Sequence, residues 1–154
     1  MRIFRSAQDQ DFAVIANISE LIYQNMLSLG HPAFFNWSNG AMQTELKQAS
    51  QVWVAEENAQ ILAFIVLREL SDAWEVSALA SNPLFWGRGC MSSLLSDVIE
   101  RFTRGDNGKE IWLEVHEENH PARQLYQKLG LVEVGRRSRY YSDGGSAVLY
   151  SYQR

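Results

Sequence analysis

The chain has 154 residues, of which 46% are hydrophobic, and this suits one globular domain covering residues 1–154. Its formal net charge of -4 offers no overall attraction to nucleic acid or to anionic lipid. A single cysteine, Cys90, excludes an internal disulfide, and the N-terminus has no apolar run of signal-peptide or membrane-span length. We therefore expect a cytoplasmic protein, a monomer or weak dimer, that binds neither membrane nor nucleic acid directly.

The first half of the chain predicts a strand, two helices and three further strands. Residues 1–5 suit the first strand, and residues 13–29 suit a helix whose apolar side chains recur on one face. Gly30, with Pro32 after it, ends that helix. The second helix and the three strands are expected at residues 39–48, 51–55, 61–67 and 74–80.

The second half begins with a strongly amphipathic helix that follows Gly87 and Gly89 and is broken at residues 105–108. A short helix at residues 122–129 has Pro121 in its first turn. The remaining strands are expected at residues 111–115, 131–141 and 147–152. The resulting order, β-α-α-β-β-β-α-β-α-β-β, predicts an α/β fold of the mixed α+β kind, with helices on the faces of one sheet.

The first chemical motif, Gly87-Arg88-Gly89, lies between a strand and the amphipathic helix. Glycines let the backbone come close to a ligand, and free N–H groups at a helix start can hold a pyrophosphate. Arg88 could add a positive charge. The motif is neither the dinucleotide fingerprint nor a Walker loop, and a tight connection is the commoner reason for such a turn.

The second motif joins a carboxylate, Glu114, on one strand to a phenol, Tyr126, on the helix that follows. An amine must lose a proton before it attacks a thioester, and a phenol can protonate the thiolate that leaves. The pair would therefore suit acyl transfer to an amine. From spacing alone, a solvent-facing strand position for Glu114 and a core position for Tyr126 are the commoner explanations.

Both motifs, in this order, resemble the Gcn5-related N-acetyltransferase (GNAT) family over nearly the whole chain. In that family a loop of the form Arg/Gln-x-x-Gly-x-Gly/Ala holds the pyrophosphate of acetyl-CoA. Trp86, Gly89 and Met91 occupy the three defined positions of this loop. Gly89 matches the residue type of the family, whereas Trp86 and Met91 do not. The resemblance implies six to seven mostly antiparallel strands flanked by about four helices, and an acetyl-CoA-dependent acyltransferase without a metal.

Within the family, the chain looks most like the bacterial ribosomal-protein-alanine N-acetyltransferases, the RimI type. The stretches that carry this resemblance are Leu113-Glu114-Val115, Asn119, Leu125-Tyr126, Leu129-Gly130, Arg136-Arg137 and Tyr140-Tyr141. They imply transfer to the N-terminal α-amine of a ribosomal protein. Two alternatives remain open: acetylation of a small amine or polyamine, and a non-catalytic acetyl-CoA-binding module, to which Trp86 and Met91 point.

The resemblance also implies roles for individual residues, with Glu114 as the general base and Tyr126 as the general acid. Acetyl-CoA would be contacted by Leu79, Ala80, Ser81, Gly87, Arg88, Gly89, Cys90, Met91, Ser92 and Asn119. Asn119 also suits a helix N-cap, and both roles can hold together. Glu117 and Glu118, close to Glu114 in sequence, would favour a cationic acceptor.

A third pattern, His-Glu-x-x-His at residues 116–120, is that of zinc hydrolases. It binds zinc when both histidines lie one turn apart on one helix. Because a strand runs into His116 and Pro121 follows His120, we expect no metal site and no role for either histidine. Cys90 has no histidine near it in sequence, so we expect a small buried thiol rather than a nucleophile.

A basic cluster late in the chain raises the question of RNA binding. Its three members are Arg136, Arg137 and Arg139. Three charges are too few to argue a nucleic-acid site, so a solvated strand edge is the favoured interpretation.

Overall fold

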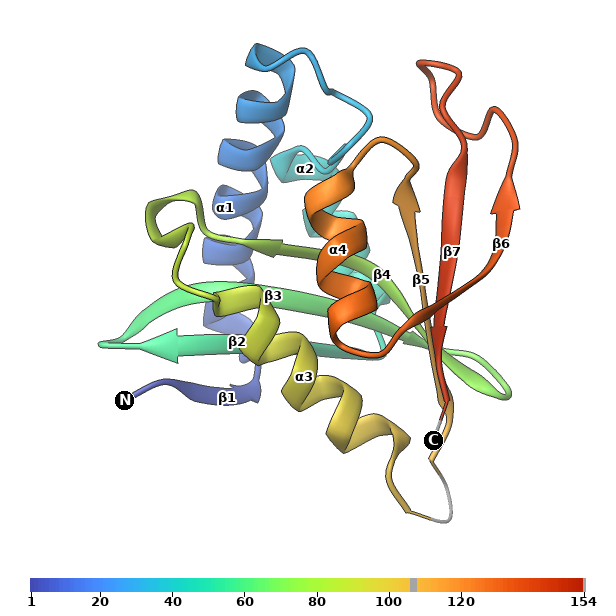
Figure 1. Cartoon of the computed structure of the whole chain (residues 1–154). Coiled ribbons are helices and arrows are strands. Elements are labelled where there is room, and N and C mark those ends of the chain that lie inside the picture. The colour runs from blue at the N-terminus through green and yellow to red at the C-terminus, as the bar shows by residue number, and fades with distance from the viewer. Residues whose placement is uncertain (106–107, 154) are drawn as a thin grey trace.

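The computed structural model describes residues 1–105 and 108–153. Within these residues the strands form one sheet in the order β1-β2-β3-β4-β5-β7-β6, and helices cover both of its faces (Figure 1). β4 and β5 pair in parallel, whereas every other neighbouring pair is antiparallel. The predicted mixed sheet of mostly antiparallel strands is therefore confirmed. That residues 1–154 form a single domain stays a prediction.

The elements follow the predicted order along the chain. The strands are β1 (Ile3–Ser6), β2 (Gln51–Glu57), β3 (Gln60–Glu69), β4 (Ala73–Ser81), β5 (Glu110–His116), β6 (Val132–Arg137) and β7 (Ala147–Tyr152). The helices are α1 (Asp9–Ser28), α2 (Asn39–Gln48), α3 (Cys90–Thr103) and α4 (His120–Lys128), with a short 3-10 turn, η1 (Pro83–Phe85), before α3. None of the described helices is long and apolar enough to cross a membrane.

The central strand β3 divides the core into two clusters. Successive side chains of a strand point to opposite faces of the sheet. Ile65 and Leu67 therefore join the cluster under α3 and α4, whereas Phe64 and Val66 join the cluster under α1 and α2. All four are fully buried. β3 therefore contributes side chains to the cores on both faces of the sheet.

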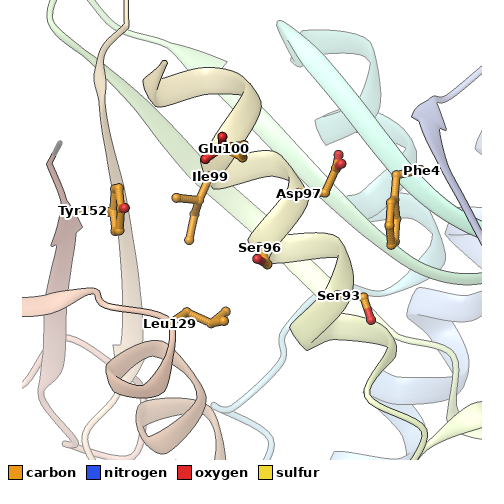
Figure 2. Close-up of a pocket in the computed structure, with 8 residues that line it drawn as sticks. All are labelled: Phe4, Ser93, Ser96, Asp97, Ile99, Glu100, Leu129 and Tyr152. Carbon is orange, nitrogen blue, oxygen red and sulfur yellow. The ribbon is translucent and has the colours of Figure 1, made fainter. Parts of the chain in front are cut away.

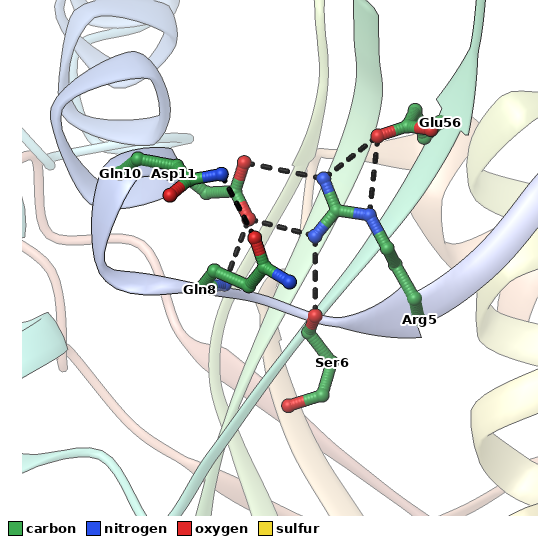
Figure 3. A network of polar contacts seen from close by, with 6 residues as sticks. All are labelled: Arg5, Ser6, Gln8, Gln10, Asp11 and Glu56. Carbon is green, nitrogen blue, oxygen red and sulfur yellow. Dashed lines mark hydrogen bonds and ion pairs between the residues drawn. The ribbon is translucent and has the colours of Figure 1, made fainter. Parts of the chain in front are cut away.

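The start of α1 depends on a polar contact between distant segments. Arg5 at the end of β1 donates to Asp11 Oδ2 at 2.7 Å and to Glu56 Oε1 at 2.8 Å (Figure 3). Asp11 also accepts the backbone N–H of Gln8 at 2.7 Å, just before the first turn. A carboxylate in that turn complements the helix dipole. The helix thus begins at Asp9, earlier than apolar periodicity predicts.

One predicted element boundary differs from the structure, and one predicted break lies partly outside the described residues. The strand predicted at residues 131–141 is wrong at its C-terminal end, because β6 stops at Arg137. Arg139 takes a left-handed φ of 51°, and the Tyr141 N–H donates to the Gly145 carbonyl at 3.0 Å. Residues 138–146 therefore form a loop, the β6–β7 loop. Of the break predicted at residues 105–108, residues 106 and 107 lie outside the described part; α3 ends at Thr103.

Candidate functional site

The strands β4 and β5 pair at their starts and then part (Figure 1). Their last paired residues are Val76 on β4 and Leu113 on β5. β4 nevertheless continues to Ser81, and β5 to His116. Beyond the split, the facing edges of β4 and β5 no longer pair with each other. Their N–H and C=O groups are therefore available to a ligand that enters the gap.

The split is built into β4 by a bulge. Val66 of β3 pairs with Ala78, but the next residue, Leu67, pairs with Val76, so Ser77 is an extra residue in β4. A bulge bends its strand and increases the local twist. β4 consequently stays with β3, while β5 stays with β7.

Glu114 is the first residue of β5 beyond the split. Its neighbours Leu113 and Val115 belong to the core cluster under α3 and α4, so the Glu114 side chain lies on the opposite face. That side chain is 27% exposed, and its Oε1 lies 3.0 Å from Nε of Arg137. The structure thus presents a carboxylate beside the gap, on the face that α1 and α2 cover.

Tyr126 on α4 lies on the other face of the sheet. It is buried, and its ring packs edge-on against Tyr150 at 5.7 Å. Burial, followed by its neighbours Tyr141 and Tyr150, raises the pKa of Tyr126 above its ordinary value of 10.0. The phenol therefore keeps its proton at neutral pH. No residue in the described part of the chain hydrogen-bonds to its hydroxyl, which leaves that hydroxyl for a ligand.

Tyr141, on the β6–β7 loop, is a site residue that the sequence did not single out for a role. Burial, and then the charge of Glu114, raises the pKa of Tyr141 to about 12. Tyr141 in turn contributes to the raised pKa of Tyr126. Its phenol is therefore in electrostatic reach of both candidate catalytic residues. The paired tyrosines were the available signal, but the loop that brings Tyr141 to Glu114 depends on the fold.

The glycine motif forms the turn between η1 and α3. Gly87 has a φ of 84° and Gly89 a φ of 68°, and Gly89 is the N-cap of α3. A Cβ at either position would meet nothing within 4 Å, so the left-handed backbone, rather than crowding, requires glycine. No side chain caps α3. The N–H groups of its first turn therefore suit an anion such as a pyrophosphate.

The side chains around this turn do not obstruct it. Trp86 donates its indole N–H to the Ser81 carbonyl at 2.9 Å and so ties the turn to the end of β4. The side chain of Met91 is buried in the core cluster, away from the turn. Arg2, which the sequence gave no reason to choose, donates to Ser93 Oγ at 2.8 Å and adds a cation beside α3.

The predicted cofactor residues come from four segments of the chain. Leu79, Ala80 and Ser81 end β4, the glycine turn follows, and Cys90, Met91 and Ser92 form the first turn of α3. Asn119 is the N-cap of α4, where its Oδ1 accepts the Ala122 N–H at 3.4 Å. Its predicted capping role is therefore confirmed. Cys90 is buried, as expected of a small apolar thiol.

A hollow of about 430 Å³ elsewhere on the surface is not part of this site. Its lining residues are Phe4, Ser93, Ser96, Asp97, Ile99, Glu100, Leu129 and Tyr152. Figure 2 shows them on both sides of α3, so the hollow lies along the outside of that helix. It contains neither Glu114 nor Tyr126.

The His-Glu-x-x-His pattern is divided between two elements. His116 ends β5 and His120 begins α4, so the two histidines do not share a helix. Nε2 of His116 lies 2.8 Å from Asp143 Oδ2, and its Nδ1 accepts the Glu118 N–H at 3.1 Å. Both ring nitrogens therefore have protein partners. Among residues 1–105 and 108–153, no group of three ligating side chains could hold a metal.

Comparison with known proteins decides the family. The sequence model of the Acetyltransferase (GNAT) family matches residues 15–131. The chain belongs to the GNAT family of acetyltransferases. This membership confirms the predicted resemblance and the predicted enzyme class, an acetyl-CoA-dependent acyltransferase.

Individual relatives of this GNAT enzyme act on ribosomal proteins or bind acetyl-CoA. The ribosomal protein bS18 alanine N-acetyltransferase of Haemophilus influenzae is 29% identical over 131 residues, which cover 84% of this chain and 88% of that protein. The ribosomal-protein-S18-alanine N-acetyltransferase of Escherichia coli has a similar structure, with a TM-score of 0.73 at 23% identity over 98% of this chain and 92% of that one. Arabidopsis thaliana NAA60 in complex with acetyl-CoA gives a TM-score of 0.74 at 15% identity and covers 100% of both chains. These two solved structures share the fold of this chain.

Proposed function

We propose that this GNAT enzyme acetylates the N-terminal α-amine of a protein, with acetyl-CoA as co-substrate, Glu114 as general base and Tyr126 as general acid. The observation that carries the proposal is the parting of β4 and β5 beyond Val76 and Leu113. Glu114 lies on one face of the sheet beside that gap, and Tyr126 packs on the other. An acetyl thioester in the gap would therefore be approached by the amine from one side and by the acid from the other.

The same gap suits acetyl-CoA. Backbone N–H groups at the end of β4, at Leu79, Ala80 and Ser81, could polarise the thioester carbonyl as oxyanion donors do. The turn from Gly87 to Ser92, with the uncapped start of α3, would hold the pyrophosphate. The Asn119 amide nitrogen would be a further contact, since its capping bond uses Oδ1.

The proposed reaction needs three proton transfers, two from the acceptor nitrogen and one to the leaving sulfur. The acceptor ammonium gives a proton to the Glu114 carboxylate, directly or through water, and the free amine attacks the thioester carbon. An α-amine, with a reference pKa of about 7.7 to 8.0, loses that proton more readily than a lysine at about 10.4. The nitrogen of the tetrahedral intermediate gives its second proton to water, the C–S bond breaks, and Tyr126 protonates the CoA thiolate and then regains a proton from solvent. Desolvation in the gap raises the proton affinity of the thiolate as well as that of the phenol.

An N-terminal acceptor is favoured over a small amine by the relative from Haemophilus influenzae, whose name specifies an alanine of a ribosomal protein. Such an acceptor would be met in the cytoplasm. The alternative of a non-catalytic module rested on Trp86 and Met91. It loses support because Met91 turns into the core and Trp86 is bonded to the end of β4.

The test measures CoA thiol release with a panel of acceptors: peptides with a free N-terminal alanine, the same peptides with a blocked N-terminus and an internal lysine, and spermidine. We expect turnover with the free α-amine. Glu114→Gln should lower kcat/KM by about 10²- to 10⁴-fold, the usual contribution of a general base, and Tyr126→Phe should lower kcat. Glu75→Gln, a carboxylate on the paired part of β4, is the matched control.

The acceptor panel separates the outcomes. Equal rates with blocked and free peptides would rule out the α-amine as acceptor, and preference for spermidine would establish the small-amine alternative. Full activity in both Glu114→Gln and Tyr126→Phe would remove the assigned catalytic roles. Acetyl-CoA binding without turnover of any acceptor would leave the non-catalytic module.

A further inference from the structure

His116, which sequence reasoning set aside, lies where two loops meet. It is 2% exposed, and it ends β5 two residues after Glu114. The ring of Phe34, from the connection between α1 and α2, packs against it at 4.9 Å. On the β6–β7 loop, the ring of Tyr141 stacks on it at 4.9 Å with an interplanar angle of 26°. His116 is therefore held between the two loops that flank the end of β5.

The hydrogen bonds of His116 fix the role of each ring nitrogen. Because Nδ1 accepts the Glu118 N–H, the proton of the neutral ring is on Nε2. Nε2 therefore donates to the Asp143 carboxylate, at 2.8 Å to Oδ2. The Gly145 N–H and then His116 hold the pKa of Asp143 below its ordinary value. A hydrogen bond to an ionised acceptor is among the stronger kinds in proteins.

Gly145 allows the loop to pass this close to the ring. A Cβ at Gly145 would lie 2.2 Å from Nε2 of His116, where no side chain fits. Gly145 also donates its N–H to Asp143 Oδ1 at 2.8 Å. A second tie follows at the end of the loop, where the Glu117 N–H donates to the Ser146 carbonyl at 2.9 Å. The β6–β7 loop is thus bonded to the segment that follows β5.

The loop that His116 holds borders the proposed site. It begins after Arg137, which pairs with Glu114, and the Arg137 guanidinium lies over the ring of Tyr140 at 5.8 Å. Tyr141 feels the charge of Glu114. An acceptor amine that reaches Glu114 would therefore pass beside this loop.

We propose that His116 is a positioning residue, which, through Asp143, clamps the β6–β7 loop beside Glu114 and thereby sets the affinity for the acceptor. The inference rests on the proposed function. Ordering a loop costs conformational entropy. A loop that is already clamped has lost that entropy before the acceptor binds, so the acceptor binds more tightly. His116 itself touches no reacting atom.

The test uses Asp143, whose side chain is 43% exposed, so its replacement leaves the core intact. Asp143→Ala should raise KM for the acceptor peptide about tenfold, the effect of losing one charge-assisted hydrogen bond. KM for acetyl-CoA should stay within about twofold, because the loop does not border the glycine turn. Asp143→Asn keeps an oxygen that can accept the Nε2 proton and should restore most of the affinity. Ser142→Ala is the control within the same loop.

A second readout follows the loop itself, without activity. The exposed Arg139 lies in the loop, so limited trypsin digestion followed by mass spectrometry reports how often the loop opens. Cleavage after Arg139 should be about tenfold faster in Asp143→Ala, and equally so in Gly145→Ala, whose Cβ pushes the loop off His116. His116→Phe keeps the stacked ring but loses both hydrogen bonds, and should match these variants.

The outcomes distinguish the clamp from the function. Unchanged cleavage in Asp143→Ala would show that no clamp exists. Faster cleavage with an unchanged acceptor KM would reduce His116 to a structural residue and overturn the proposal. A wild-type chain without turnover on any α-amine peptide would overturn the proposed function and the role of the clamp with it. Turnover that Asp143→Ala leaves unaltered would overturn the clamp alone.

Discussion

Arg137 and Glu114 form an ion pair across an intervening strand. Nε of Arg137, on β6, lies 3.0 Å from Oε1 of Glu114, on β5, although β7 separates the two strands in the sheet. The side chains are 56% and 27% exposed. Such a pair contributes about 0 to 1 kcal/mol to stability. Its consequence is functional, because a cation covers one oxygen of the proposed base.

Replacing Arg137 by glutamine should expose that carboxylate to the acceptor. We expect kcat/KM for a peptide amine to rise about two- to fivefold, the equivalent of losing an ion pair worth up to 1 kcal/mol. In the wild type, raising the salt to about 0.5 M should give part of the same gain, because salt screens exposed pairs. Arg136→Gln, whose guanidinium pairs with Glu133 instead, is the control. A fall in kcat/KM would mean that Arg137 helps to bind the acceptor.

The buried phenols predict an alkaline limit to stability. Burial raises the pKa of Tyr126, and burial with the charge of Glu114 raises the pKa of Tyr141 to about 12. A group whose pKa is higher in the folded than in the unfolded state stabilises the fold. That contribution is complete below the unfolded pKa, about 10 for tyrosine, and is lost as the pH rises through the folded pKa. The midpoint temperature of thermal unfolding should therefore decrease as the pH rises from about 10 to about 12.

Thermal unfolding followed by circular dichroism from pH 8 upward measures this limit. Tyr126→Phe should show a smaller alkaline fall, because phenylalanine keeps the ring and has no proton to lose. Tyr23→Phe on α1 should behave like the wild type. An alkaline fall of the same size in Tyr126→Phe would show that Tyr126 does not cause it.

The glycine turn predicts a selective effect on the co-substrate. Alanine at Gly89 would have to hold a φ of 68°, which costs about 1 to 2 kcal/mol, so the turn should relax and move the N–H groups of α3. We expect Gly89→Ala to weaken acetyl-CoA binding about tenfold in calorimetry and to leave KM for the acceptor unchanged. Gly40→Ala in α2, where φ is not positive, is the matched control. Unaltered acetyl-CoA affinity would remove this turn from the pyrophosphate site.

The order of the elements could be predicted because it depends on local patterns. The apolar stripe of α3 and the continuous apolar run of β3 are both short-range signals, and both elements occur as expected. The predictions failed where distant residues decide. Asp11 starts α1 with the help of Arg5 and Glu56, and Arg139 ends β6 by a backbone turn that its residue type does not favour.

The candidate site was predicted as residues but not as an arrangement. The resemblance singled out Glu114 and Tyr126, yet the split between β4 and β5 depends on strand register and on the bulge at Ser77, and both are set by pairing with other strands. His116 was weighed as a metal ligand alone. Its partner Asp143 is 27 residues away, so the sequence gave no sign of the pair.

The network at the start of α1 predicts the acid limit of the fold. Asp11 is buried, and the hydrogen bond from Arg5, with that from the Gln8 N–H, holds the pKa of Asp11 below 3.8 despite burial. A group with a lowered folded pKa stabilises above its unfolded pKa and loses that contribution as pH falls through the folded value. Asp11→Asn should therefore lower the free energy of unfolding by about 2 kcal/mol at pH 7, the usual effect of losing a charged hydrogen bond.

Urea unfolding at pH 7 and at about pH 2.5 measures this loss with Asp11 ionised and after the pH has been lowered, and the difference from wild type should shrink in acid. Asp9→Asn, in the same first turn but exposed, should cost no more than about 1 kcal/mol. A loss in Asp11→Asn of the same size at both pH values would show that the charge of Asp11 is not what stabilises the start of α1.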